Sequence, residues 1–128
     1  MNSVVHFEVV ADDPQRAKKF YGSVFDWKFN ETGAEYGNYI IALTADTDEN
    51  GMNKTPGTIN GGIAGKTAET KNTIIVVDIK NTDESIKKVE VAGGKVIEGP
   101  MDIPGIGKYT RVRDTEGNIV GMMESLSR

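Results

Sequence analysis

The chain has 128 residues, a formal net charge of −4 and 38% hydrophobic residues, which fits one globular domain with a buried core. Fifteen basic residues against 19 acidic ones leave no broad cationic surface for nucleic acid, and no apolar run is long enough to cross a bilayer. The sequence has no cysteine, which excludes thiolate nucleophiles and thiolate metal sites, and it shows no export signal, so we expect a cytoplasmic protein.

Residues 4–10 alternate between residue types with period two, which predicts a half-buried strand. The odd-numbered apolar residues of this strand would pack on the core, so His6, the only histidine, and Glu8 would share the opposite face. A helix is expected over about residues 13–25, with Asp13 as N-cap and proline at the first helical position. Its apolar residues recur with helical spacing and predict a single core-facing stripe of Ala17, Phe20, Tyr21, Val24 and Phe25.

The rest of the chain predicts more strands, one more helix and two conspicuous loops. The second helix would begin at the N-cap Asn81, with Glu84 completing a capping box, and would end at Gly93. The polar segment 45–57 predicts a mobile loop, and residues 100–107 predict a turn-rich loop. Further strands are expected at residues 27–29, 39–43, 58–63, 73–79, 95–97, 109–113 and 118–123. The two halves are therefore the same β-α-β-β-β module written twice.

Several short motifs stand in a characteristic order along nearly the whole chain. Besides Val5-His6-Phe7-Glu8-Val9 and the helix start that follows it, they are Ile59-Asn60-Gly61-Gly62-Ile63, Ala92-Gly93-Gly94-Lys95-Val96 and Asp114-x-x-Gly117-Asn118-x-x-Gly121. In this combination the chain resembles the vicinal oxygen chelate superfamily, which includes glyoxalase I, extradiol dioxygenases and bleomycin resistance proteins. It looks most like the branch of predicted lactoylglutathione-lyase-related proteins.

The resemblance implies an α+β fold in which two βαβββ modules form curved mixed sheets around a central cup, with the helices packed outside. It implies a single domain over residues 1–128, made of modules at about 1–65 and 72–128. Relatives of this kind often pair as homodimers, and we expect the same here.

In metal-dependent members of this superfamily, side chains on the first, fourth, fifth and eighth strands hold a divalent ion. His6 matches the first position, whereas Gly61, Ile74 and Gly121 fall at the others. Glu8 could add a second ligand from the same strand, but a catalytic Zn²⁺ or Fe²⁺ site normally needs about three protein ligands. We therefore expect no cofactor, with divalent metal binding as the alternative.

His6 and Glu8 are the candidate catalytic residues. His6 could be a metal ligand, a general base, a polar contact to a ligand, or a structural histidine bonded to Glu8 or to backbone. A neighbouring carboxylate would raise the pKa of the imidazole and make it a better proton acceptor. If Tyr109 faces the cup, Arg111 does too, and there it would need an anion such as Glu8, Asp78 or a bound carboxylate. The candidate ligand contacts are Tyr39, Asn60, Asp78, Tyr109 and Arg111.

Three functions remain open at this stage. The first is a binding protein for an unidentified small organic molecule, similar to the bleomycin resistance type, without a catalytic metal. The second is a glyoxalase- or dioxygenase-like lyase or oxidoreductase that uses His6 and Glu8. The third is an interaction protein whose cup is vestigial and filled by its own side chains.

Overall fold

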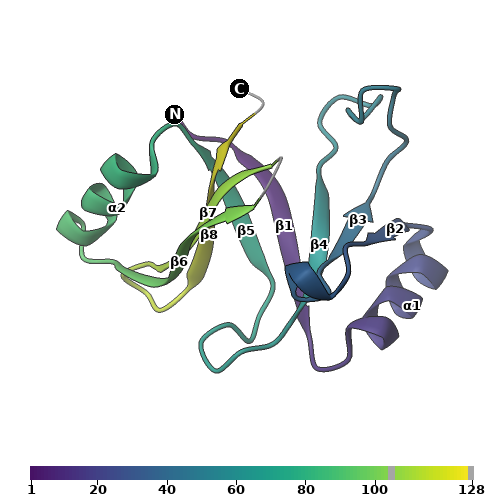
Figure 1. Cartoon of the computed structure of the whole chain (residues 1–128), viewed down its shortest axis with the longest axis horizontal. Coiled ribbons are helices and arrows are strands. Elements are labelled where there is room, and N and C mark those ends of the chain that lie inside the picture. The colour runs from purple at the N-terminus through teal and green to yellow at the C-terminus, as the bar shows by residue number, and fades with distance from the viewer. Residues whose placement is uncertain (104–105, 127–128) are drawn as a thin grey trace. The chain divides into compact units, whose positions relative to one another are not determined.

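The computed structural model describes residues 1–103 and 106–126, which fall into two compact units. The N-terminal unit is His6–Thr73, and the C-terminal unit comprises Met1–Val5 and Ile74–Arg128. Each unit has one α-helix and a mixed sheet of four strands (Figure 1). The predicted α+β class and the two βαβββ modules are therefore confirmed.

The N-terminal unit is built on two neighbouring parallel strands, β1 and β4. Strand β1 pairs with β4 in parallel. Strand β4 then pairs with β3, and β3 with β2, both antiparallel. The elements are β1 (Val4–Ala11), α1 (Pro14–Phe25), β2 (Lys28–Glu31), the short 3₁₀ helix η1 (Ala34–Tyr36), β3 (Ile40–Leu43) and β4 (Asn60–Gly65).

Helix α1 covers one face of this sheet. The core beneath it consists of Val9, Ile40 and Ile63, one residue from each of three adjacent strands. The predicted N-cap is confirmed, because an Asp13 carboxylate oxygen accepts a hydrogen bond from the Arg16 amide at 3.1 Å. The even-numbered residues of β1 are thereby directed to the sheet face opposite the helix, as the alternation predicts.

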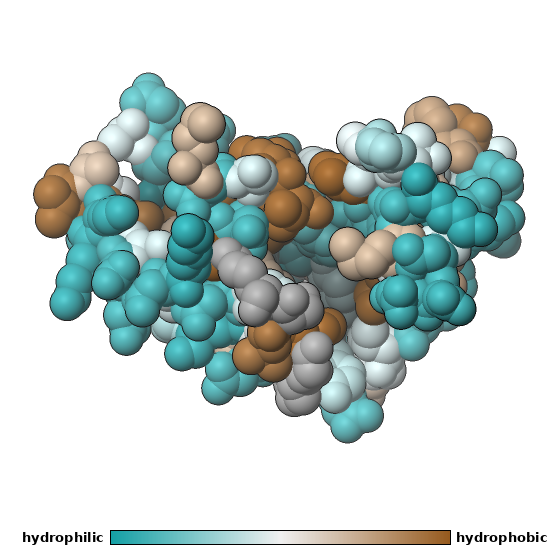
Figure 2. All heavy atoms as spheres, turned by 90° about the horizontal axis from the view of Figure 1, so that it is seen from above, coloured by the Kyte–Doolittle hydropathy of each residue, from teal (hydrophilic) through white to brown (hydrophobic). Residues whose placement is uncertain are grey.

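The predicted core stripe of α1 is only partly correct. Ala17 and Tyr21 pack on the core, but Phe20, Val24 and Phe25 are each more than half exposed. The stripe is wider than the contact that one short helix makes with a four-stranded sheet, so its outer part stays at the surface. Hydrophobic residues are visible between hydrophilic ones on the face shown in Figure 2.

The C-terminal unit repeats the pattern with a different strand length at its edge. Strand β5 pairs with β8 in parallel, and β7 and β6 follow as antiparallel neighbours. The elements are β5 (Ile74–Ile79), α2 (Thr82–Val91), β6 (Lys95–Ile103), β7 (Gly107–Arg113) and β8 (Ile119–Ser125). Ile79, Val112 and Met122 form the core under α2.

The C-terminal unit confirms one sequence prediction and corrects another. The Asn81 cap is confirmed, because its side chain accepts from the Glu84 amide at 2.9 Å. The turn-rich loop predicted at 100–107 is wrong in its first part, since β6 runs on to Ile103 with two register shifts against β7. A strand can contain glycine and proline, here at positions 99 and 100, where a bulge interrupts its pairing. The sequence pattern alone had suggested a loop from position 100 onward. Residues 104–105 of that predicted loop lie outside the described residues.

The segment 45–57 folds back on itself. Thr47 forms a bridge with Asn53, and the Lys54 amide donates to the Asp46 carbonyl at 2.8 Å. The predicted mobility of the segment 45–57 stays a prediction. Among the helices of the described residues, none has the length and apolar character needed to cross a membrane.

Candidate functional site

The N-terminal unit brings two of the predicted site residues into direct contact. Nε2 of His6, on β1, lies 3.1 Å from the hydroxyl oxygen of Tyr39, which immediately precedes β3. Both side chains are half-buried, so the pair is packed on the sheet yet within reach of solvent. This imidazole–phenol pair lies on the face opposite α1 and combines a flat apolar ring with two groups that can each donate or accept a hydrogen bond.

The Tyr39 ring lies over a glycine of the central strand β4. The strand register pairs Gly62 with Glu8 of β1 and with Ile41 of β3. A Cβ atom at Gly62 would overlap the hydroxyl and ring of Tyr39, so only glycine leaves room for the ring in this position. Gly62 therefore determines where Tyr39, and with it the hydroxyl next to His6, can lie.

The electrostatics of His6 differ from the sequence expectation. Burial disfavours the charged imidazolium and lowers the pKa of His6 below its usual value, and the negative charge of Glu8 opposes that shift without reversing it. Glu8 is itself only 4% exposed. The predicted effect of the carboxylate is present, because the charge of Glu8 raises the pKa of His6, but desolvation of the ring is larger and the net shift is downward. Burial therefore favours the neutral form of His6.

The C-terminal unit contains a corresponding tyrosine. The Tyr109 ring of β7 lies over Gly121 of β8, where an added Cβ atom would be 2.6 Å from the Tyr109 hydroxyl oxygen. Nε of Arg111 donates to that hydroxyl at 3.2 Å, and Nη1 of Arg111 is 3.3 Å from a carboxylate oxygen of Glu98. Arg111 and Tyr109 thus share a face, as the alternation of β7 predicts. The sequence analysis proposed Glu8, Asp78 or a bound anion as the partner of Arg111. It did not predict the contact with Glu98.

The two remaining predicted contacts have structural hydrogen bonds. The Asn60 side chain donates to the Asn53 side chain at 2.8 Å and accepts from the Thr44 amide at 3.0 Å, which ties the 45–57 hairpin to β4. The backbone of Asp78 bonds to the amino-terminal residues, with its carbonyl accepting from the Asn2 side chain at 3.0 Å. A ligand contact by either side chain stays a prediction.

The residues present do not fit a catalytic divalent metal. Within the described residues, no group of three histidine or acidic side chains could hold an ion. The strand register also corrects the fourth-strand position, because Gly61 pairs with Phe7 on the helix face, whereas Gly62 lies on the face of His6. At Gly62 and at Gly121 a tyrosine ring fills the space into which a ligating side chain would extend.

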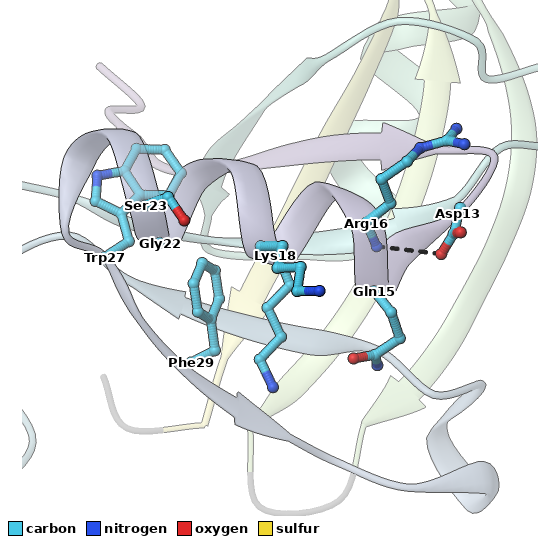
Figure 3. Close-up of a pocket in the computed structure, with 9 residues that line it drawn as sticks. Asp13, Gln15, Arg16, Lys18, Gly22, Ser23, Trp27 and Phe29 are labelled. Atoms are coloured by element: carbon cyan, nitrogen blue, oxygen red, sulfur yellow. Dashed lines mark hydrogen bonds between the residues drawn. The ribbon is translucent and has the colours of Figure 1, made fainter.

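A hollow that the sequence analysis missed lies on α1. It has a volume of about 770 Å³ and is lined by the polar stripe of the helix and by Trp27 and Phe29 (Figure 3). Figure 3 shows Lys18 and Phe29 on one side of the helix, with Arg16 directed to the other. Lys18 pairs with Glu31 of β2 at 3.1 Å, which holds the helix to the sheet edge. In the sequence, this surface is indicated only by polar residues that recur with helical spacing along residues 13–23.

A second hollow of about 620 Å³ lies along α2 in the C-terminal unit. Its floor includes Val77, Val120 and Met122 from the sheet face under the helix. The floor is therefore part of the core that α2 leaves partly uncovered.

Two successive βαβββ modules define this chain as a small α+β protein, with His6 on the first strand of the first module. The model of the Glyoxalase/Bleomycin resistance protein/Dioxygenase superfamily matches residues 3–122. The chain belongs to this superfamily. No curated protein sequence matches it.

Solved structures of other proteins share the fold at low sequence identity. A hypothetical protein from Bacillus halodurans superposes with a TM-score of 0.63 and 15% identity over 95% of this chain and 93% of its own. A methylmalonyl-CoA epimerase variant from Streptomyces coelicolor, in complex with 2-nitronate-propionyl-CoA, gives 0.67 and 13% over 99% and 96%. The methylmalonyl-CoA epimerase from Mycobacterium tuberculosis gives 0.61 and 11% over 94% and 85%. Identities this low establish the fold alone.

Proposed function

We propose that this protein binds a small organic molecule on the sheet face that carries His6 and Tyr39, without a catalytic metal. The observation that supports the proposal is the position of the Tyr39 ring, which lies over Gly62 with its hydroxyl 3.1 Å from His6. A ring held in this way offers a ligand a flat apolar surface, with the polar imidazole and hydroxyl at its edge. The proposal includes the cytoplasmic homodimer expected from the sequence.

A second candidate is an enzyme that uses His6 as a proton acceptor. The position of His6 supports it, because the imidazole lies on the sheet face beside the Tyr39 hydroxyl and its lowered pKa keeps the ring in the neutral, proton-accepting form, although as a weaker base. Glu8 would then stabilise the imidazolium that forms, through the same charge interaction that opposes the shift. Methylmalonyl-CoA epimerases are among the solved structures that share this fold, which supports considering an enzyme as the second candidate.

Metal content and ligand binding separate these candidates. We would purify the protein without chelator, measure Zn, Fe, Mn and Ni, and screen a set of small organic compounds for an increase in the thermal midpoint, with and without chelator. The proposal predicts far less than one equivalent of metal, and binders whose effect chelator leaves unchanged. One equivalent of metal that is lost in His6→Ala would contradict it. Turnover of a binder that His6→Gln abolishes would favour the enzyme.

A matched variant shows whether binding occurs on the proposed face. Tyr39→Ala removes the ring over Gly62, whereas Tyr36→Ala removes an exposed tyrosine of η1 that is close in sequence. Binders should lose affinity in Tyr39→Ala and keep it in Tyr36→Ala. Equal affinity in both variants would place the ligand elsewhere, for instance in the hollow on α1.

A further inference from the structure

Two asparagines of the chain are followed directly by glycine, in the pairs Asn50-Gly51 and Asn60-Gly61. Such a pair is chemically labile, because the glycine nitrogen has no neighbouring Cβ atom to hinder its attack on the asparagine side chain. The attack also requires a backbone that can bring this nitrogen to the side-chain carbonyl carbon. The reactivity of each pair therefore depends on how firmly the fold holds it.

The Asn60-Gly61 pair is held within the sheet. Strand β4 pairs with β1 on one side and with β3 on the other, and Gly61 is buried. The Asn60 side chain donates to the Asn53 side chain at 2.8 Å and accepts from the Thr44 amide at 3.0 Å. The backbone at this pair can turn only if a central strand leaves the sheet, which costs a large part of the stability of the unit.

The Asn50-Gly51 pair lies at the tip of the 45–57 hairpin, where both residues are exposed. Three hydrogen bonds to one residue, Asp48, close this turn. Its carboxylate accepts from the amides of Asn50 and Met52 at 2.8 and 3.0 Å, and its carbonyl accepts from the Gly51 amide at 3.0 Å. The two bonds to the carboxylate are exposed, so they break at low cost because water replaces the partner.

We propose that Asn50 is a site of spontaneous deamidation in the folded protein, and that Asp48 limits the rate of this reaction by holding the turn closed. When the turn opens, the Gly51 nitrogen loses its proton to solvent base and bonds to Cγ of Asn50. The side-chain nitrogen takes up a proton and leaves as ammonia, which gives a succinimide. Water then opens the succinimide at one of its two carbonyls, so the products are aspartate and isoaspartate.

The product differs from the original turn in charge and in length. A carboxylate replaces an uncharged amide beside the acidic residues Asp48 and Glu49, and isoaspartate adds one atom to the backbone. The hairpin that carries this change is tied by Asn53 to Asn60, which is in register with His6 of β1. The modified segment is therefore anchored beside the candidate site, although the reaction itself does not depend on the proposed function.

The test incubates the intact protein at pH 8 and 37 °C and follows both pairs by mass spectrometry of proteolytic peptides. Conversion at Asn50 should be at least about tenfold faster than at Asn60. In guanidinium chloride, which unfolds the sheet, the two pairs should react at similar rates. Equal rates in the folded protein, or an Asn50 that stays intact there, would overturn the inference. A preference for Asn50 that persists in denaturant would do the same, because it would come from neighbouring residues in the sequence.

Variants of the hairpin test the role of Asp48. Asp48→Ala removes the carboxylate that holds the turn and should raise the rate at Asn50 about tenfold. Asp46→Ala is the matched control, since it removes another exposed carboxylate and keeps the carbonyl that accepts from Lys54. It should react like the unmodified protein. An unchanged rate in Asp48→Ala, or an equal acceleration in Asp46→Ala, would overturn the assignment of Asp48.

Discussion

The pH dependence of stability should carry a contribution from His6 that a single substitution removes. In the folded chain, burial lowers the pKa of His6, with Glu8 opposing. In the unfolded chain the imidazole returns to an ordinary pKa of about 6.5. Between these two values the unfolded state binds a proton that the folded state does not. The free energy of unfolding must therefore fall as the pH decreases through this window.

The size of the effect follows from the width of the window. Each unit by which the pKa is depressed corresponds to about 1.4 kcal/mol of lost stability once the pH lies below the folded value. Well above pH 6.5 the contribution of His6 is constant, because the ring is then neutral in both states. Urea unfolding at half-unit intervals from pH 8 to pH 5 measures this profile.

His6→Gln supplies the comparison, because glutamine keeps polar atoms on the strand and does not titrate. Carboxylates that do not interact with His6 contribute equally to both proteins, so the difference between the two profiles isolates the histidine together with its charge interaction with Glu8. The free energy of unfolding of the unmodified protein, minus that of His6→Gln, should be larger at high pH than at low pH. Parallel profiles would refute the reasoning, and a difference of opposite sign would mean that the attraction of Glu8 exceeds the cost of burial.

Three further predictions concern the fold. Ile63→Ala, at a fully buried core position, should lower the free energy of unfolding by about 2–5 kcal/mol in urea, while Val91→Ala on the exposed face of α2 should change it by less than about 0.5 kcal/mol. Glu124→Ala should cost about 1–3 kcal/mol in the same assay, because its carboxylate accepts from the amide and the hydroxyl of Thr82 at 2.7 and 2.8 Å at the start of α2; an unchanged midpoint would contradict this role. Light scattering at micromolar concentration should give twice the mass of one chain, and a single-chain mass would count against the homodimer.

Local signals in the sequence predicted most elements of this fold, though not the full length of β6. The caps at Asp13 and Asn81 were predictable because each depends on a side chain that bonds an amide three residues later. The alternation of β1 placed His6 on the face opposite the helix core for an equally local reason. The continuation of β6 past Pro100 was not predictable, because bulges depend on the partner strand.

The site was less predictable, since it depends on pairing between strands. A shift of one residue on β4 exchanges Gly61, on the helix face, for Gly62, on the face of His6. Nothing local distinguishes the two glycines. The pKa of His6 likewise results from burial and charge acting in opposite directions, and only the structure shows which is larger. The exposure of Phe20 on α1 was also not predictable from local sequence. Helical spacing identifies an apolar stripe, but the width of the surface that covers the stripe depends on the rest of the fold.

Gly121 affects the site through the side chain that lies next to it. The position has no side chain of its own, and the Tyr109 ring occupies the adjacent space. The glycine of one strand and the tyrosine of its neighbour thus fit together, and a larger residue at position 121 would overpack this space. Gly121→Glu alone should therefore destabilise the protein in urea without creating metal affinity, because its side chain meets the ring. Gly121→Glu with Tyr109→Ala should recover stability relative to the single variant. Equal stability of the single variant and the unmodified protein would show that the ring can move aside, and would weaken the steric argument for a metal-free site.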